Sequence, residues 1–321
     1  MALPAVAIAT GDPGGIGPEI SIKAALDPGV RAMCRPILVG DRRVLEAHAR
    51  ACRLSLEGIE LIERQQLEPR ELRIGEIAAA HGLAALDSAC AAIQAALAGE
   101  VSAVVAAPHN ESAIHAAGVE FDGYPSFVAR IAGLPPEDGI LMLCFEHQGR
   151  EVRIAHVTLH ASVASALRLI TRERVAKTIR SVVSALGRLG IARPRVAIGG
   201  VNPHAGENGL FGDEESRIVK PALEELRREG ADVDGPIGAD ILIQREGYDA
   251  YVVMLHDQGH VAAKLLAPNR VAAMTIGTPV LFSSVAHGSA LDIAGKNRGD
   301  PRAVVEAIAR LTSKNGSRRN G

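Results

Sequence analysis

The sequence has no tryptophan, and aromatic residues make up only 2% of its 321 positions. An apolar core must therefore be built from Ala, Val, Ile and Leu, which suits an α/β protein with buried parallel strands. Hydrophobic residues nevertheless make up 47% of the chain. This content and this length allow a large core and favour two lobes over one.

Strong net charge and long apolar runs are missing too. The formal net charge is −2, with both signs mixed along the chain, so we expect neither nucleic acid nor a membrane surface as a partner. No stretch approaches the roughly 18 apolar residues of a membrane span. The start, MALPAVAIATGDPGG, has no basic region, and its apolar run is too short for a signal peptide. These absences predict a soluble cytoplasmic protein.

Cysteine is also scarce. The four cysteines are far apart, and none lies beside a histidine motif: Cys34, Cys52, Cys90 and Cys144. At this size and spacing a disulfide framework is not expected, and the pattern favours reduced thiols.

Short apolar runs alternate with helix-like segments, which is the pattern of the α/β class. The predicted strands include Val101–Ala107, Ile140–Cys144, Val152–Val157, Arg195–Gly199, Tyr251–Leu255 and Val271–Ile276. The predicted helices include Gly82–Ala98, Ala161–Leu189, Asp213–Glu229 and Pro301–Thr312. The polar and basic end, Ser313–Gly321, is predicted to be a disordered tail.

Three histidines follow apolar, strand-like runs or the loops after them: His160, His204 and His256. Loops at the carboxyl ends of parallel strands are where α/β enzymes bind their ligands. Imidazole is the commonest neutral ligand of a divalent metal, and three such ligands leave a coordination position open for a substrate. The three histidines are therefore candidate ligands of a catalytic metal. The alternative is that each is a half-exposed polar residue.

The surroundings of two of these histidines favour the metal interpretation. The segment Asn202–Glu207 reads NPHAGE, and His256–His260 reads HDQGH, so both are dense in polar side chains. Downstream, Lys264 stands among Ala and Leu residues. Burial would lower its pKa and suit it to donate or accept a proton. The alternative for Lys264 is a surface lysine.

Two segments are rich in glycine and small residues. In His287–Lys296, which reads HGSALDIAGK, the backbone can approach a ligand closely, and Asp292 is suited to a ribose hydroxyl. A turn leading into a helix is the alternative. The segment Gly11–Pro18 follows a predicted strand, but its spacing matches neither the Rossmann fingerprint nor the P-loop. It is either a tight turn or a ligand loop.

Taken together, these segments resemble a known family. In chain order they read IATGDPGGIGPEI, GGVNPHAGENG, MLHDQGH and HGSALDIAGKN. They are similar to the 4-hydroxythreonine-4-phosphate dehydrogenase (PdxA) family of vitamin B6 synthesis, from about Ala7 to about Asn297. The last segment is also similar to the adenosine-binding loop of isocitrate and isopropylmalate dehydrogenases.

The resemblance implies a fold like that of isocitrate dehydrogenase, with two α/β lobes around a central cleft. We expect residues 1–125 and 275–321 to form the first lobe and residues 126–274 the second. The resemblance also implies a homodimer with a shared active site. In it, His160 and His204 of one subunit and His256 of the other would bind a divalent metal, with zinc favoured.

Further roles are implied by the same resemblance. Asp240 and Asp257 would position substrate, metal or cofactor, and Lys264 would contact the substrate. NAD or NADP would bind to His287, Gly288, Ala290, Asp292, Ile293 and Asn297. The metal would lower the pKa of a hydroxyl β to a carboxylate, so that hydride passes to the nicotinamide and CO2 is then lost. A metal-dependent lyase without redox chemistry is the alternative from another class.

The sequence departs from the family pattern where a substrate phosphate would bind. Tyr124-Pro125 replaces an expected His-Thr pair, Asn110 replaces Lys, Ala273 replaces Asn and Phe282 replaces Arg. A phosphate dianion needs charge-assisted donors, whereas Phe282 favours an apolar or ring-shaped substrate. Tyr124, Asn110 and Phe282 are thus candidate substrate residues. We expect a non-phosphorylated diol acid such as terephthalate cis-dihydrodiol, with 4-hydroxythreonine 4-phosphate as the alternative.

Overall fold

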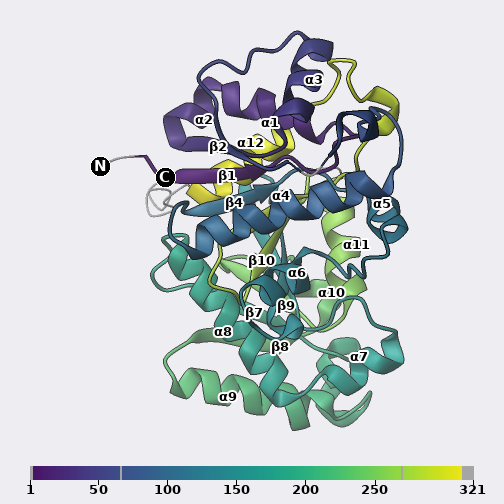
Figure 1. The fold of residues 1–321 in the computed structure, drawn as a ribbon. Helices are drawn as coiled ribbons and strands as arrows, with labels where there is room; N and C mark the ends of the chain where they lie inside the picture. The colour runs from purple at the N-terminus through teal and green to yellow at the C-terminus, as the bar shows by residue number, and fades with distance from the viewer. Residues whose placement is uncertain (1–2, 66, 269, 313–321) are drawn as a thin grey trace. The chain divides into compact units, whose positions relative to one another are not determined.

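The computed structural model describes residues 3–312 apart from 66 and 269 (Figure 1). The chain forms two compact α/β units. Among the described residues, unit 1 comprises 3–139 and 278–312, and unit 2 comprises 140–277. The expected lobe boundaries, 125/126 and 274/275, differ from these. Helix α6 (Tyr124–Ile131) runs across the first expected boundary and packs on α4 (Ala79–Leu97) of unit 1, so the chain leaves unit 1 only after Gly139.

Unit 1 is built on five strands in the order β3-β2-β1-β4-β11, and each neighbouring pair is parallel. Its strands are β1 Ala5–Ala9, β2 Arg35–Gly40, β3 Glu60–Glu63, β4 Ala103–Ala106 and β11 Phe282–Val285. Besides α4 and α6, its helices are α1 Gly17–Leu26, α2 Pro28–Met33, α3 Arg42–Cys52, α5 Glu111–Ala116 and α12 Arg302–Thr312. Three short 3-10 turns are η1 Pro69–Glu71, η2 Pro136–Asp138 and η5 Leu291–Ile293.

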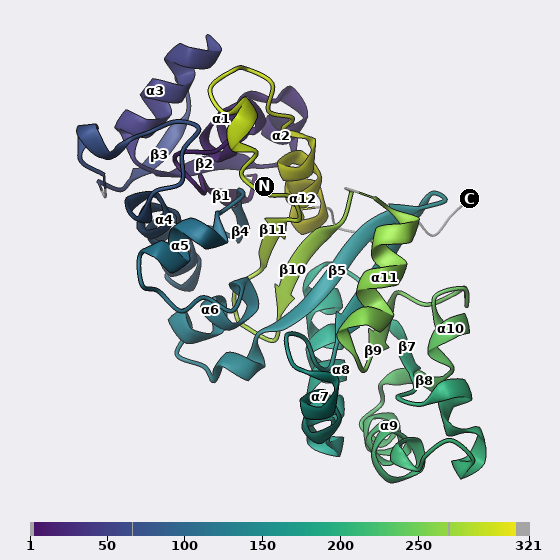
Figure 2. The ribbon, with the colours of Figure 1, turned by 90° about the vertical axis from the view of Figure 1, so that its right-hand side faces the viewer.

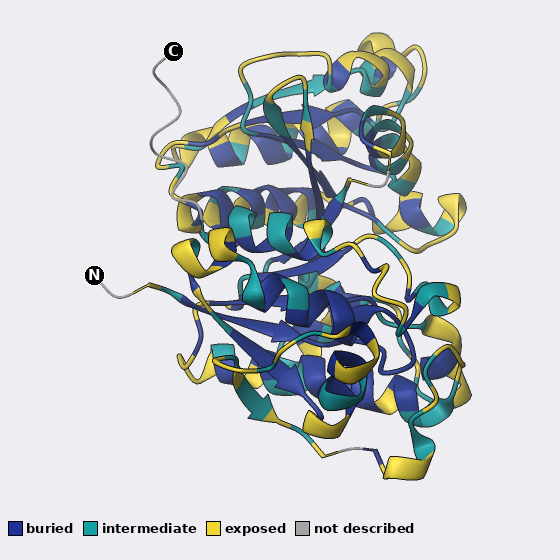
Figure 3. Cartoon of the chain, turned by 90° about the horizontal axis from the view of Figure 1, so that it is seen from above, coloured by how far each residue is buried: buried dark blue, intermediate teal, exposed yellow. Residues whose placement is uncertain are grey.

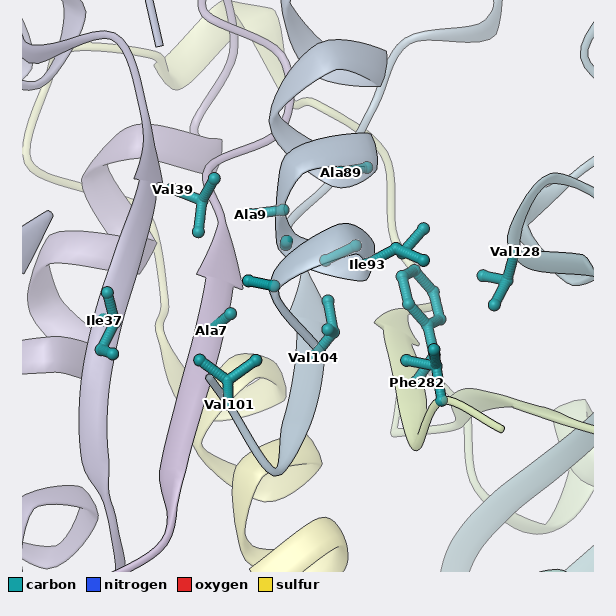
Figure 4. Packing of buried hydrophobic residues seen from close by; sticks show 14 of the residues in the cluster. Ala7, Ala9, Ile37, Val39, Ala89, Ile93, Val101, Val104, Val128 and Phe282 are labelled. Atoms are coloured by element: carbon teal, nitrogen blue, oxygen red, sulfur yellow. The ribbon is translucent and has the colours of Figure 1, made fainter. Parts of the chain in front are cut away.

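The core of unit 1 joins small residues to a few aromatic ones. Ala89 and Ile93 of α4 pack against Ala7 and Val104 of the strands, and the Phe282 ring lies at the side of this cluster nearest Val128 (Figure 4). Alanine on both sides lets the helix lie close to the sheet, and the larger Ile93 and Val104 fill the space that the alanines leave. A sequence with so few aromatic residues therefore still builds a closed core.

Unit 2 is built on six strands in the order β10-β5-β6-β9-β7-β8. They are β5 Ile140–His147, β6 Arg150–His156, β7 Arg195–Gly199, β8 Asp232–Ile237, β9 Ala250–Val253 and β10 Ala272–Ile276. Strand β5 is antiparallel to both β10 and β6, whereas β6, β9, β7 and β8 run parallel. The four parallel strands therefore present their carboxyl ends at one edge.

The helical segments of unit 2 are α7 Val163–Leu169, α8 Arg172–Arg188, η3 Pro203–Gly209, the π-helical turn η4 Glu215–Val219, α9 Lys220–Arg228, α10 Ala239–Leu242 and α11 His256–Leu266. Helix α11 lies alongside β5 (Figure 2). The single helix predicted over Ala161–Leu189 is wrong, because two helices occur there. Ser162 and Thr171 each accept a hydrogen bond from the backbone N–H three residues later, so each begins a separate helix.

The strands are the most buried part of each unit, and exposed residues gather on helices and connecting loops (Figure 3). Within the described residues no disulfide joins the four cysteines, and the reduced state of their thiols stays a prediction. In the described part of the chain, no helix combines the length and apolar character needed to cross a membrane. The predicted tail, Ser313–Gly321, lies outside the described residues.

Most strands that lead to a candidate site were predicted from their apolar sequences, but β8 and β11 were not. The predicted Arg195–Gly199 is β7 itself. Strand β8 reads DVDGPI and β11 reads FSSV, and neither is an apolar run. The polar segment that begins at His256 is helical from its first residue, because α11 begins there.

Candidate active site

The first part of the candidate site lies at the carboxyl ends of two neighbouring strands in unit 2. Strands β6 and β9 pair in parallel, with His156 opposite Val253. The pairing continues past the strands, since Thr158 donates from its Oγ1 to the Met254 carbonyl at 2.6 Å. The chain therefore delivers His160 and His256 to the same place, with ring centroids 5.8 Å apart.

A pocket of about 380 Å³ opens between these strand ends. Imidazoles, a carboxylate and a hydroxyl share it with apolar side chains, and its lining includes Thr158, His160, Val163, Leu255, His256 and Asp257. Ligand pockets typically combine an apolar lining with a few convergent polar groups. This pocket has that composition.

His256 is oriented by its neighbour in the sequence. Its Nδ1 lies 2.6 Å from Oδ1 of Asp257, and 34% of its side chain is exposed. A carboxylate accepts hydrogen bonds, so this contact places the ring proton on Nδ1 and leaves Nε2 with a lone pair. That is the tautomer in which a histidine binds a metal through Nε2.

Further imidazoles pack behind His256. The His260 ring, one turn along α11, stacks on it at 3.8 Å, and the His156 ring lies 4.8 Å from His260. Gly259 makes room for His156, because a Cβ at Gly259 would lie 2.3 Å from the His156 Nε2. Burial lowers the pKa of His156 to about 3 and that of His260 to about 4. Both rings are therefore neutral at physiological pH.

Lys264 lies on the same helix, two turns after His256, and its side chain is exposed. The burial that the sequence suggested for Lys264 is therefore not found in the single chain. Its role as a substrate or proton-transfer residue stays a prediction.

His204 lies in a different part of unit 2. It is in the loop after β7, 63% of its side chain is exposed, and its Nδ1 is 3.5 Å from the Glu207 carboxylate. Its backbone lies beside Gly238, where a Cβ would be 3.5 Å from the His204 Cα and 2.7 Å from the Asp240 Oδ1. The structure therefore brings His204 and Asp240 together at the ends of β7 and β8.

The three candidate metal ligands do not converge within one chain. Among the described residues, no group of three or more His, Cys, Asp or Glu side chains is arranged to hold a metal ion. The two candidates that meet are His160 and His256, not His160 and His204 as expected. Strand order explains this, because β9 lies next to β6, whereas the loop carrying His204 turns toward β8. Metal binding by the three histidines stays a prediction.

Unit 1 presents a second edge of strand ends, where the two glycine-rich segments meet. The Asp12 N–H donates to the Pro108 carbonyl at 2.8 Å, which joins the loops after β1 and β4. The Ile16 N–H donates to the Ser289 carbonyl at 2.8 Å, and a Cβ at Gly15 would lie 2.6 Å from the Ser289 Cβ. The segment Gly11–Pro18 thus supports the candidate cofactor loop, a role that its spacing did not reveal.

The candidate cofactor loop lies largely at the surface. Gly288 and Asp292 are exposed, and a Cβ at Gly288 would meet nothing within 4 Å. Ala290 and Asn297 have φ of 43° and 57°, so the backbone turns sharply at both. The Lys296 Nζ donates to the backbone carbonyl of Asp292 at 2.7 Å, so this bond does not involve the Asp292 carboxylate. Nicotinamide-cofactor binding by this loop, together with His287 and Ile293, stays a prediction.

The candidate substrate residues of unit 1 lie in or beside an aromatic cluster. It consists of His109, Phe121, Tyr124, Phe127 and Phe282, with ring centroids 4.9–6.2 Å apart. Phe282 is fully buried, and the buried Tyr124 hydroxyl has no hydrogen-bond partner. Burial lowers the pKa of His109, so its ring is neutral. This cluster therefore contains no cation.

The two other departures from the family pattern are also placed. The Asn110 Oδ1 accepts from the Ala113 N–H at 3.0 Å, so this side chain caps the start of α5. Ala273 lies within β10, opposite Leu143. Substrate contact by Asn110, Tyr124 and Phe282 stays a prediction.

Sequence reasoning gave no role to several residues that the structure places at these sites. His109 follows the predicted strand that ends at Pro108, which was a usable signal. His260 was visible in HDQGH. His156 was hidden inside a predicted strand, and Glu215 inside a predicted helix.

The fold defines the structural class of the protein. A likeness to a β-decarboxylating dehydrogenase from Thermococcus kodakarensis (TM-score 0.54, 17% identity, covering 96% of this chain and 82% of that one) shows the fold alone. The fold is the isocitrate-dehydrogenase-like α/β fold, as predicted.

Closer similarities define the family. The family model for pyridoxal phosphate biosynthetic protein PdxA matches residues 32–311. A 1,2-dihydroxy-3,5-cyclohexadiene-1,4-dicarboxylate dehydrogenase from Comamonas sp is 44% identical over 97% of this chain and 98% of its own length. A D-threonate 4-phosphate dehydrogenase from Cupriavidus necator is 38% identical over 95% and 96%. The chain belongs to the PdxA family, and its class of activity is that of a dehydrogenase.

Solved structures agree with this assignment. A 4-hydroxythreonine-4-phosphate dehydrogenase from Burkholderia phymatum has a TM-score of 0.82 at 33% identity, covering 98% of this chain and 99% of that one. A terephthalate 1,2-cis-dihydrodiol dehydrogenase from Burkholderia xenovorans has a TM-score of 0.76 at 44% identity, covering 97% and 98%. The family resemblance seen in the sequence motifs is confirmed.

Proposed function

We propose that the protein is a metal-dependent, NAD(P)-linked dehydrogenase of a non-phosphorylated cyclic diol acid, with loss of CO2 after oxidation. Terephthalate cis-dihydrodiol, 1,2-dihydroxy-3,5-cyclohexadiene-1,4-dicarboxylate, is the substrate that we favour. The observation that carries this choice is the aromatic cluster around Tyr124 and Phe282, which contains no cation.

The chemistry of the cluster supports a ring over a phosphate. A phosphate dianion requires charge-assisted donors, and leaving it without one in a closed site costs about 1.5–3 kcal/mol per lost partner. Aromatic rings instead favour another flat ring by edge or offset contacts. The chain has eight Phe and Tyr residues in all, five Phe and three Tyr, so four of them in one cluster is a marked concentration. The 44% identity to the Comamonas dihydrodiol dehydrogenase points the same way.

The donor set fits a divalent metal, with zinc favoured. His160 and His256 share a pocket, and the Asp257 contact leaves the Nε2 of His256 as a metal-binding atom. A bound metal would lower the pKa of the substrate hydroxyl and stabilise the enolate left by CO2. His204 is the third ligand in this proposal, and it comes from a second copy of the chain because it does not join the pair within its own.

The apolar surface of unit 2 supports a homodimer. Leu265 on α11 is 76% exposed and Leu210 in the His204 loop is 72% exposed, and Phe211 and Val261 are also exposed. These side chains flank the residues that the shared site requires. A partner that covers them would remove a large apolar area from water.

The remaining residues have roles that follow from their positions. Asp257 holds the His256 ring, Asp240 lies beside His204, and Lys264 lies on the helix that begins with His256. We assign Lys264 to proton transfer at the substrate. Bound NAD or NADP would accept the hydride, held by the loop that contains Gly288 and Asp292.

The decisive test is a turnover assay with added zinc and either NAD or NADP. We expect reduced nicotinamide and CO2 in equal amounts from the cis-dihydrodiol of terephthalate. D-threonate 4-phosphate and 4-hydroxythreonine 4-phosphate should give turnover at least a hundredfold slower. Faster turnover of either phosphate would overturn the substrate proposal, and a product formed without reduced nicotinamide would point to a lyase.

A further inference from the structure

The loop that carries His204 has an unusual backbone. From His204 to Asn208, five consecutive residues have positive φ, between 40° and 81°, and Gly209 follows at 96°. Four of these five are not glycine. For an L-residue the left-handed conformation costs roughly 1–2 kcal/mol, so this turn persists only if the surrounding contacts determine it.

One buried carboxylate anchors the start of this loop and contacts its middle. Glu215 is 3% exposed and begins the π-helical turn η4. Its Oε1 accepts from the N–H groups of Val201 at 2.7 Å and Asn202 at 2.8 Å, and its Oε2 accepts from the Asn202 Nδ2 at 3.0 Å. Burial alone would raise the pKa of Glu215, but the hydrogen bonds from Asn202 and Val201 outweigh it and keep the pKa below its ordinary value.

The same carboxylate also contacts the middle of the loop. A Cβ at Gly206 would lie 2.7 Å from the Glu215 Oε2, and a Cβ at Gly200 would lie 3.0 Å from its Oε1. Glu215 therefore contacts the loop both before and after His204. The His204 side chain is largely exposed, and its ring has an edge contact with Phe211 at 5.9 Å, so its position depends mainly on the backbone of the loop.

We propose that Glu215 is a positioning residue, which fixes the left-handed turn so that the His204 imidazole is presented ready to bind a metal. This inference rests on the proposed function, in which His204 is a metal ligand. Glu215 is not itself a ligand, because its two oxygens are taken up by the loop. A preorganised loop binds a metal more tightly, since the ordering of the backbone is already complete before the metal arrives.

The test is a titration of the full-length protein with Co²⁺, followed by the visible ligand-field absorption of the bound ion. Glu215→Gln keeps an acceptor oxygen but loses the charge, and we expect about tenfold weaker Co²⁺ binding. Glu215→Ala removes the anchor, and we expect about hundredfold weaker binding, the range typical of groups that orient metal ligands. If Glu215→Ala does not fold, Glu215→Gln carries the test.

Glu19→Gln is the matched control. Glu19 is also a buried carboxylate, fully enclosed in unit 1, where its Oε1 accepts from the Gly299 N–H at 2.7 Å and from the Lys23 Nζ at 2.7 Å. Its loss should lower the melting temperature as Glu215→Gln does. It should leave Co²⁺ affinity and the absorption spectrum unchanged, which separates positioning from general stability.

Two outcomes would overturn the inference, and they are distinguishable. Wild-type Co²⁺ affinity and spectrum in Glu215→Gln, together with lost binding in His204→Ala, would remove the role of Glu215 alone. Wild-type affinity in His204→Ala would remove the ligand role of His204 and the inference with it.

Discussion

Two histidines of unit 1 are buried structural residues, whereas three histidines of unit 2 lie where a ligand could reach them. In unit 1, His48 and His81 are fully buried and bonded to backbone groups, such as the Pro13 carbonyl at 2.9 Å from the His48 Nε2. In unit 2, His160 and His256 line a pocket, and His204 is exposed on a strained loop. The same residue type fills a core in one unit and lines a pocket or an exposed loop in the other.

The cause of the difference is what satisfies each ring nitrogen. Backbone carbonyls and N–H groups surround His81 in unit 1, so its ring has no free position for a ligand. In unit 2, Asp257 occupies only one nitrogen of His256. A buried imidazole bonded on both sides, such as that of His81, stabilises a loop, whereas one that is bonded on a single side and lines a pocket is prepared for a ligand. The predictions below test this contrast, in order of decreasing effect.

The largest expected effect comes from replacing one histidine in each unit by alanine and comparing the two variants. His256→Ala should lower turnover by about a thousandfold and abolish metal binding, because it removes a ligand while little packing is lost. His81→Ala should keep metal affinity but lose about 2 kcal/mol of stability, since its backbone partners become unsatisfied. Metal content and urea unfolding of both variants are the measurements. Full metal occupancy in His256→Ala would contradict the contrast.

Lys264→Ala should lower kcat by about a hundredfold while Co²⁺ and NAD still bind, because a proton-transfer group contributes on the order of 10² or more to a rate. Titrations with Co²⁺ and with NAD measure whether the variant still binds both, which distinguishes a lost proton-transfer group from a folding defect. Lys220→Ala, which changes an exposed lysine on α9, is the control and should be as active as the parent. Unchanged kcat in Lys264→Ala would show that this lysine is only a surface residue.

Tyr124→Phe tests whether the aromatic cluster of unit 1 binds the substrate. We expect KM for the cyclic diol acid to rise about tenfold, while stability is kept or raised, because a buried hydroxyl without a partner costs roughly 1–3 kcal/mol. Tyr248→Phe is the control, since the Tyr248 hydroxyl donates to Asp234, and it should lose stability without changing KM. An unchanged KM in Tyr124→Phe would show that the Tyr124 hydroxyl does not contact the substrate.

Acid should destabilise the metal-free protein through its buried histidines. The folded pKa of His156 is about 3, below the unfolded value of about 6.5, so the unfolded state binds more protons between these values. Stability from this group is complete above pH 6.5 and falls as the pH drops, by about 1 kcal/mol per pH unit. His156→Gln should flatten the slope of unfolding free energy between pH 6 and about 4, and the exposed His115→Gln should not. Equal slopes would be the contrary result.

The sequence predicted the class of fold and the strands that end in the site. Patterns of apolar residues gave β7 and most of β4, β5, β6 and β9, because buried parallel strands are apolar on both faces. They missed β8 and β11, whose polar or glycine-containing sequences give no such pattern. Apolar spacing alone does not separate α7 from α8, because their boundary is set by the N-caps Ser162 and Thr171.

Within the site, the sequence identified candidate ligands but not their neighbours. The rule that ligands gather at strand ends identified His160 and His256 as candidates, but it did not predict that these two residues would share a pocket within one chain. It could not show that His204 turns toward β8, because the left-handed turn depends on contacts with Glu215, which follows in the sequence and is buried only after folding. The aromatic cluster was equally hidden, since its members come from distant segments.

The chain enters and leaves unit 2 through paired strands, and this sets an order for synthesis. Ile140 of β5 lies directly opposite Ile276 of β10, so the two ends of residues 140–277 are neighbours. Every strand of unit 2 is synthesised before β11 and α12. The first strands of unit 1 are synthesised earliest, but unit 1 is completed last because it also needs β11 and α12. Unit 2 can therefore begin to fold before unit 1 has its last strand.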